Sequence, residues 1–222
     1  MIRAVLLDAL GTLVELPAPW PALVEELAER GVVVSEDEAR TALMAEMAYY
    51  RGHHDEATGP AELDDLRDRC TDVLRAALPA HARAAPDLRG ALLGSLRFRP
   101  YPEVPAVLAQ LRALEVARVV VSNWDVSLRG VLDATGLAPL VDGAVISAEV
   151  GTAKPDPAIF MRALEVAGAG ACEALHVGDT ADADLAGARA AGIRALHLDR
   201  SGADPDALTS LAELPRLVRS AV

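Results

Sequence analysis

The chain has 222 residues, 52% of them hydrophobic, and this length suits one large domain or a core domain with a smaller insertion. Its formal net charge of -12 disfavours nucleic acid and anionic membranes as partners, because their phosphates would repel it. The chain has two distant cysteines, Cys70 and Cys172, so we expect reduced thiols and no zinc site. No apolar run is long enough for a signal peptide or a membrane span, and we therefore expect a cytoplasmic protein.

Short apolar runs that end in polar or glycine residues predict five buried strands. In chain order these runs cover residues 5–7, 116–121, 144–146, 176–177 and 193–198. Helical patterns lie between the later strands, at residues 103–114, 126–134, 157–166 and 183–191. Strands that alternate with helices of about this length indicate βαβ units. We therefore predict an α/β fold with a doubly wound, Rossmann-like parallel sheet.

Residues 17–95 show no strand pattern. They open with three prolines at positions 17, 19 and 21, which we interpret as a linker. Amphipathic helical patterns follow at residues 23–30, 36–51, 61–78 and 86–96. We therefore predict an α/β core made of residues 1–16 and 96–222, with an all-helical domain, residues 17–95, inserted after the first strand.

Polar side chains stand where three of the predicted strands end. Asp8 follows the first strand, Ser122 and Asn123 follow the second, and Asp179 follows the fourth. In open parallel sheets, ligands bind beyond the carboxyl ends of the strands. These distant segments are therefore expected to meet in one site.

Lys154 is the only lysine of the chain, which has twenty arginines. It lies in the loop segment Gly-Thr-Ala-Lys-Pro-Asp-Pro, residues 151–157. An exception in a chain that otherwise uses arginine indicates that this position needs a compact ammonium rather than a planar fork. One cation, several carboxylates and hydroxyl or amide donors suit phosphoryl transfer or related chemistry. We therefore expect a small-molecule substrate that is anionic.

Four motifs in this order resemble the haloacid dehalogenase-like hydrolase superfamily, in its branch with a helical cap inserted after the first motif. The resemblance covers nearly the whole chain. The motifs are Asp8-x-x-Gly11-Thr12-Leu13; Ser122-Asn123; Lys154-Pro155-Asp156-Pro157; and His176-Val177-Gly178-Asp179 followed by Asp184. The resemblance implies that residues 17–95 form a cap.

The resemblance also implies how the first and last motifs act. Asp8 would be the nucleophile and would form an aspartyl phosphate or ester, which water then hydrolyses. A Mg²⁺ ion would be held by the carboxylates of Asp8 and Asp179 and by the backbone carbonyl of Leu10. Asp184 would be a further metal ligand, either directly or through water.

The remaining motif residues would handle the charge of the substrate. Lys154 would neutralise the transferring group and keep Asp8 ionised. Ser122 and the backbone of Asn123 would donate hydrogen bonds to the substrate oxygens. Thr12 would orient Asp8 or donate in the same way, and a helix N-cap is an equally good interpretation of this threonine.

Leu10 departs from the family pattern. Phosphatases of this superfamily usually carry a second aspartate here, as general acid and base, and a leucine can do neither. Positioned proton transfer typically contributes about 10²- to 10⁴-fold to the rate. The substrate could have a good leaving group, as acyl and aryl phosphates do, or His53 or His54 of the insertion could supply the acid. A halogenated substrate would need no acid, since halide leaves without a proton.

Three functions stay open from the sequence. The first is a Mg²⁺-dependent hydrolase of a small phosphorylated metabolite. The second is a metal-independent 2-haloacid dehalogenase, whose family also lacks the second aspartate, although the Asp179 and Asp184 motif resembles that of the metal-binding phosphatases. The third is a catalytically weak binding or regulatory protein. Schiff-base chemistry from the cap is excluded, because residues 17–95 contain no lysine.

Overall fold

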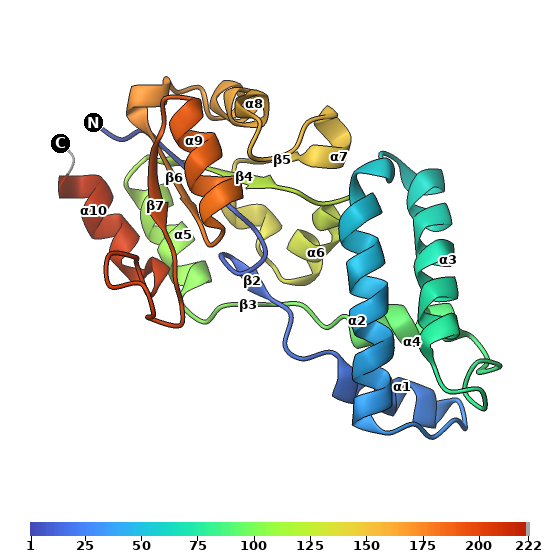
Figure 1. Ribbon diagram of the computed structural model, residues 1–222. Helices are drawn as coiled ribbons and strands as arrows, with labels where there is room; N and C mark the ends of the chain where they lie inside the picture. Colours follow the sequence, from blue (N-terminus) through green and yellow to red (C-terminus); the bar gives the residue numbers. More distant parts are fainter. Residues whose placement is uncertain (221–222) are drawn as a thin grey trace. The chain divides into compact units, whose positions relative to one another are not determined.

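The computed structural model describes residues 1–220 (Figure 1). The chain forms two compact units, one made of Met1–Glu15 with the chain from Arg99 onward, and the other of Leu16–Phe98. Strands β2 (Val14–Glu15) and β3 (Arg99–Pro100) pair antiparallel where the chain leaves the first unit and where it returns. The inserted unit thus begins and ends on one short two-stranded ribbon.

The first unit is built on a sheet of five parallel strands in the order β5-β4-β1-β6-β7. Their bounds are β1 (Ala4–Leu7), β4 (Ala117–Ser122), β5 (Gly143–Ile146), β6 (Ala174–Gly178) and β7 (Arg194–His197). The central strand β1 is flanked by the later strands β4 and β6, so the chain winds outward in both directions. This order confirms the predicted doubly wound α/β fold.

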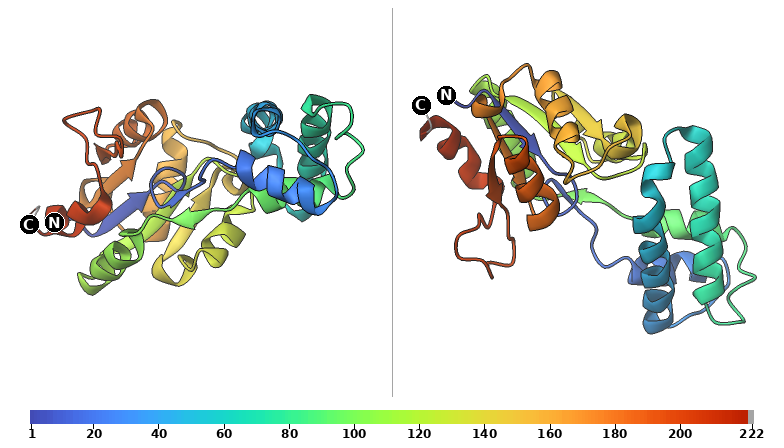
Figure 2. Two further views of the ribbon diagram at one scale, coloured as in Figure 1. Left: turned by 90° about the horizontal axis from the view of Figure 1, so that it is seen from below. Right: turned by 45° about the horizontal axis from the view of Figure 1, so that its top comes forward.

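Helices cover both faces of this sheet (Figure 2). On one face, Leu6 and Val119 of the sheet pack with Ile159 and Phe160 of helix α8 (Pro157–Ala167). Successive side chains of a strand point to opposite faces, so strands buried on both sides need the continuous apolar runs seen in this sequence. The other helices of this unit are α5 (Val104–Ala113), α6 (Leu128–Ala134), α7 (Ser147–Val150), α9 (Gly187–Ala190) and α10 (Leu214–Ser220), with 3₁₀ turns at Ala138–Leu140, Ala171–Glu173 and Leu211–Glu213.

One predicted helix of the first unit has a different form. The segment predicted as a regular helix over residues 183–191 is a π-helical turn, Ala181–Ala186, that continues into α9. The carboxylate of Asp184 turns back to accept a hydrogen bond from the backbone N–H of Thr180, at 3.0 Å. Wide turns of this kind are often found at functional sites, because they re-aim a side chain.

The second unit is all-helical and has its own apolar core. It contains α1 (Trp20–Glu29), α2 (Glu36–His53), α3 (Pro60–Ala77) and α4 (Leu88–Ser95), with a 3₁₀ turn at His54–Glu56. Helix α1 begins three residues earlier than predicted, since Pro21 is tolerated in a first turn and does not belong to a linker. The core of this unit includes Leu27, Leu43, Leu74 and Leu92, one from each helix. Within residues 1–220, no helix has the length and apolarity that a membrane crossing requires.

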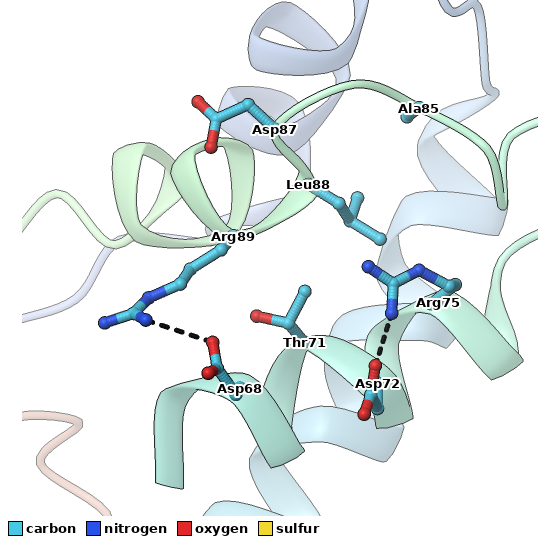
Figure 3. A pocket seen from close by; sticks show the side chains of 8 residues that line it. All are labelled: Asp68, Thr71, Asp72, Arg75, Ala85, Asp87, Leu88 and Arg89. Carbon is cyan, nitrogen blue, oxygen red and sulfur yellow. Dashed lines mark hydrogen bonds and ion pairs between the residues drawn. The ribbon is translucent and has the colours of Figure 1, made fainter. Parts of the chain in front are cut away.

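A surface hollow of about 440 Å³ lies beside α3 and the start of α4 (Figure 3). Arg89 pairs with Asp68 at 3.0 Å and with Asp64 at 2.5 Å, while Arg75 pairs with Asp72. Exposed pairs of this kind contribute about 0 to 1 kcal/mol each. Both arginines are thus already paired with aspartates, and the third aspartate of the lining, Asp87, adds negative charge, so the hollow does not favour an anionic ligand.

Glu46 is a buried carboxyl group in the core of the helical unit. Its residue is 4% exposed, and the thiol of Cys70 is its hydrogen-bond partner. Burial raises the pKa of Glu46, although the Cys70 bond and the charge of Arg51 oppose this. The folded state therefore keeps this proton to a higher pH than the unfolded chain does.

We predict that Glu46→Gln stabilises the protein at pH 8 and has little effect at pH 4. The wild type loses stability as pH rises from the unfolded pKa of this group to its raised folded pKa, because the folded state binds more protons in that window. Each tenfold difference in proton affinity corresponds to about 1.4 kcal/mol. Urea denaturation at both pH values measures the effect, and an equal change at the two would contradict it.

Candidate active site

The register of the sheet brings the predicted site residues to one edge. Leu7, the last residue of β1, lies opposite both Val120 of β4 and Val177 of β6, so the three strands end within two residues of one another at the same edge. Asp8 follows directly and donates its backbone N–H to the carbonyl of Val177, at 3.0 Å. Ser122 closes β4, and Asp179 follows β6.

Lys154 lies between two buried carboxylates. Its Nζ is 2.5 Å from Oδ1 of Asp8 and 2.6 Å from Oδ1 of Asp184. Lys154 and Asp8 are each 6% exposed, and Asp184 is 1% exposed. Removing three charges from water is costly unless the geometry is close and the remaining polar atoms are bonded. The cluster meets the first condition through these two short contacts.

The main chain of Lys154 is held by the side chain of Asn123. The amide oxygen of Asn123 accepts from the Lys154 backbone N–H at 2.7 Å, and the amide nitrogen donates to the Lys154 carbonyl at 2.8 Å. This paired contact joins the loop after β4 to the loop before α8. It directs the lysine side chain towards Asp8 without using any of its ammonium protons.

Asp184 is held from two further directions. Nε2 of His176 is 3.0 Å from its Oδ1, and the backbone N–H of Thr180 is 3.0 Å from its Oδ2. His176 is fully buried in β6, and its ring packs edge-on against Phe160, with 5.0 Å between the ring centroids. Burial lowers the pKa of His176, so the ring is neutral and Nε2 carries the proton donated to Asp184.

Burial and charge set the protonation of this cluster. Burial raises the pKa of Asp8 to about 6, with Lys154 opposing the shift and the carboxylate of Asp184 adding to it. Burial also disfavours ionised Asp184, but the hydrogen bond from His176 and the charge of Lys154 lower its pKa. Burial would lower the pKa of Lys154, yet the two carboxylates raise it. Lys154 and Asp184 thus form an ion pair, and Asp8 takes up a proton more readily than Asp184 does because its pKa is raised and that of Asp184 is lowered.

Asp179 completes a group of three carboxylates. One oxygen from each of Asp8, Asp179 and Asp184 lies within 4.8 Å of the others. Burial and the charge of Asp184 raise the pKa of Asp179. Three carboxylates against one ammonium leave an excess of negative charge, and oxygen donors at this spacing fit a hard divalent cation.

Gly11 allows the loop after Asp8 to pass close to Asp179. Its φ of +82° is a conformation that other residues rarely adopt, and a Cβ at this position would lie 2.1 Å from Oδ2 of Asp179. The neighbouring Leu10 is 45% exposed, so this loop presents an apolar side chain to solvent next to Gly11.

Two predicted hydroxyl groups are buried, and one of them contacts Asp8. Ser122 is buried and donates to Oδ1 of Asp8 at 3.4 Å. Thr12 is also buried, and among residues 1–220 its Oγ1 has no hydrogen-bond partner. The N-cap interpretation of Thr12 is wrong, since a turn leads from it into β2 and the next helix begins at Trp20.

The geometry defines a buried carboxylate–ammonium cluster at the carboxyl edge of a parallel sheet. The model of the haloacid dehalogenase-like hydrolase family matches residues 2–192, and the chain belongs to this family. It is therefore an enzyme of the hydrolase class.

Individual relatives are known as phosphatases and as a dehalogenase. The chain is 41% identical to a phosphoserine phosphatase of Thermus thermophilus over 52% of its own length and 47% of the relative's. It is 30% identical to a glyceraldehyde 3-phosphate phosphatase of Methanopyrus kandleri over 90% of its own length and 85% of the relative's. The solved structure of a 2-haloacid dehalogenase from Pseudomonas syringae is 29% identical, with a TM-score of 0.65 and full coverage of both chains.

We predict that Lys154→Met destabilises the protein by about 3 to 5 kcal/mol at pH 7.5, because two carboxylates lose their buried counter-charge. The loss should shrink at pH 5, because Asp8, whose pKa burial raises to about 6, is then largely protonated in the folded state and needs less counter-charge. Urea denaturation in the presence of a chelator measures both values. Arg129→Met, which removes only the exposed pair with Glu149, is the matched control. A loss no larger than that of the control would contradict the prediction.

Proposed function

We propose that this protein is a Mg²⁺-dependent phosphatase of a small phosphorylated metabolite and that it acts through an aspartyl-phosphate intermediate. The observation that carries the proposal is the position of Lys154 between Asp8 and Asp184, beside the third carboxylate of Asp179. The phosphatase relatives support the same class of substrate. The reduced cysteines are consistent with a cytoplasmic location, which stays part of the proposal.

Asp8 is the proposed nucleophile. Its Oδ1 accepts from Lys154 and Ser122, and the attack is assigned to the other oxygen, Oδ2. A bond forms between this oxygen and phosphorus while the bond from phosphorus to the leaving group breaks. Water then attacks phosphorus, releases inorganic phosphate and restores the Asp8 carboxylate. Lys154 lowers the energy of both steps, because its charge offsets that of the phosphoryl oxygens.

The proposed metal site uses the carboxylates of Asp8, Asp179 and Asp184 and the backbone carbonyl of Leu10. A bound Mg²⁺ supplies positive charge that stabilises the phosphoryl group during transfer. Asn123 and His176 act indirectly, since they hold Lys154 and Asp184 in place. Donation from the Asn123 backbone and the Thr12 hydroxyl to substrate oxygens stays a prediction from the family resemblance.

Leu10 restricts the substrates in this proposal. Its exposed side chain cannot protonate a leaving group, so acyl and aryl phosphates are expected to react faster than alkyl phosphates. We propose that residues 17–95 act as the cap that selects the substrate. His53 remains a candidate acid in that unit. Its Nδ1 contacts the carbonyl of Tyr49 at 2.7 Å, so Nε2 is the ring nitrogen left to transfer a proton. His54 is the second candidate, and its Nδ1 lies 3.1 Å from Asp55.

A metal-independent 2-haloacid dehalogenase is the second candidate function. Leu10 and the similarity to the Pseudomonas syringae enzyme favour it. The three clustered carboxylates favour the phosphatase, since a haloacid site has no need for this excess of negative charge. A binding or regulatory protein that keeps the site without turnover is the third.

We predict that the wild type releases phosphate from p-nitrophenyl phosphate and acetyl phosphate with Mg²⁺ and that chelator abolishes the release. Asp8→Asn should lower kcat by at least about 10³-fold, because the variant lacks the nucleophile. Chloride release from 2-chloropropionate that persists in chelator would identify the dehalogenase. Ligand-induced stabilisation without turnover of either substrate would identify the binding protein.

Leu10→Asp tests the account of the missing acid. The variant should hydrolyse a simple alkyl phosphate about 10- to 100-fold faster than the wild type, since it restores a group that can protonate an alkoxide. Acetyl phosphate, which needs little protonation, should show a much smaller gain. Leu10→Asn is the matched control, because it has nearly the same shape and no acidic proton. A folded Leu10→Asp variant with an unchanged rate would contradict this account.

A further inference from the structure

The nucleophile loop, residues 8–14, is the segment whose conformation fixes the site. Ala9 accepts three backbone hydrogen bonds within it, from Thr12, Leu13 and Val14, and the N–H of Gly11 bonds the carbonyl of Val14 at 2.8 Å. Gly11 passes so close to Asp179 that even a Cβ would clash with that carboxylate. A shift of the loop away from it would separate Asp8 from Asp179.

Arg200 holds this loop from outside. It lies in the segment after β7, and its Nε donates to the carbonyl of Gly11 at 3.0 Å while its Nη2 donates to the carbonyl of Thr12 at 2.7 Å. The two acceptors are consecutive carbonyls of the same loop. A planar guanidinium can bond both at once, whereas an ammonium cannot present this fork.

The guanidinium itself is fixed by its other neighbours. It lies over the ring of Tyr101 at 3.4 Å from the centroid, and its Nη1 pairs with Glu103 at 2.7 Å. Glu103 also accepts from Ser210 at 3.2 Å. The backbone N–H of Tyr101 bonds the carbonyl of Leu13 at 3.1 Å, so the platform under Arg200 is joined to the same loop.

These contacts are more than a surface ion pair. The side chain of Arg200 is 19% exposed and that of Glu103 is 21% exposed, so solvent screens them only in part. The positive charge is balanced by Glu103, and the hydrogen bonds to the loop carbonyls are charge-assisted and therefore stronger than neutral ones. Within the loop, Arg200 bonds the backbone carbonyls of Gly11 and Thr12 and not their side chains.

We propose that Arg200 is a positioning residue, which fixes the nucleophile loop so that Asp8 keeps its place beside Lys154 and Asp179. It acts through the carbonyls of Gly11 and Thr12, with Tyr101 as its platform. The catalytic part of this proposal rests on the proposed function, while the structural part does not.

Hydrogen exchange of loop peptides tests the structural part directly. In Arg200→Met, the amides of residues 11–14 should exchange at least tenfold faster than in the wild type. Arg200→Lys should give an intermediate value, because an ammonium keeps the charge but lacks the planar fork that holds the two carbonyls while it lies on the ring of Tyr101. Arg129→Met, which loses an exposed arginine–carboxylate pair, is the matched control and should leave these amides unchanged.

Two variants of Tyr101 separate the platform from its hydroxyl group. Tyr101→Phe keeps the aromatic face under the guanidinium and should exchange like the wild type, whereas Tyr101→Leu should resemble Arg200→Lys. If Arg200→Met does not fold, Arg200→Lys and Tyr101→Leu decide the question. Unchanged exchange of residues 11–14 in the folded variants would overturn the proposal.

Kinetics with p-nitrophenyl phosphate test the catalytic part. Arg200→Met should lower kcat by about 10- to 100-fold, because small displacements of a nucleophile are costly, with KM within about twofold of the wild type. A raised KM with unchanged kcat would assign Arg200 to substrate binding and overturn a positioning role. A wild type that hydrolyses no phosphate ester would end the phosphatase proposal alone, since the exchange measurements still decide whether Arg200 holds the loop.

Discussion

The contact of one ammonium with two buried carboxylates is the interaction on which the rest of this site depends. Lys154 bonds Asp8 and Asp184 at once, and it comes from a loop far from either in the sequence. Such a cluster is stable only when its members are held by other bonds. Asn123, in the loop after β4, supplies these to the lysine main chain, and His176, in β6, supplies one to Asp184.

The charge of the cluster explains what the site can bind. The single ammonium of the cluster is outnumbered by carboxylates, so the site repels an anionic substrate unless a cation offsets this charge. The proposed substrate therefore requires the proposed metal, whose charge would offset that of the carboxylates. Leu10 adds a second constraint to the proposed mechanism, because its apolar side chain cannot transfer a proton and the proposal therefore requires a substrate whose leaving group needs little protonation.

Local patterns predicted the parts of the site that depend on strand ends. Apolar runs that stop at Asp8, Ser122 and Asp179 predict that these residues lie at the ends of strands. Lys154 is predicted to be functional because it is the one lysine of the sequence. No sequence pattern predicts the roles of His176 and Arg200, because their contacts depend on partners that meet only in the folded chain. Arg200 is one of twenty arginines, so composition does not distinguish it. The π-helical turn at Asp184 depends on tertiary contacts, which helical periodicity does not predict.

The most direct test of the central claim is to trap the covalent intermediate. The protein is mixed with acetyl phosphate and Mg²⁺, quenched in acid and digested, and the peptides are analysed by mass spectrometry. The account predicts a phosphoryl group on the peptide that contains Asp8, with no such label in Asp8→Asn. Phosphate release by the wild type without label at Asp8, or with the label on another residue, would contradict it.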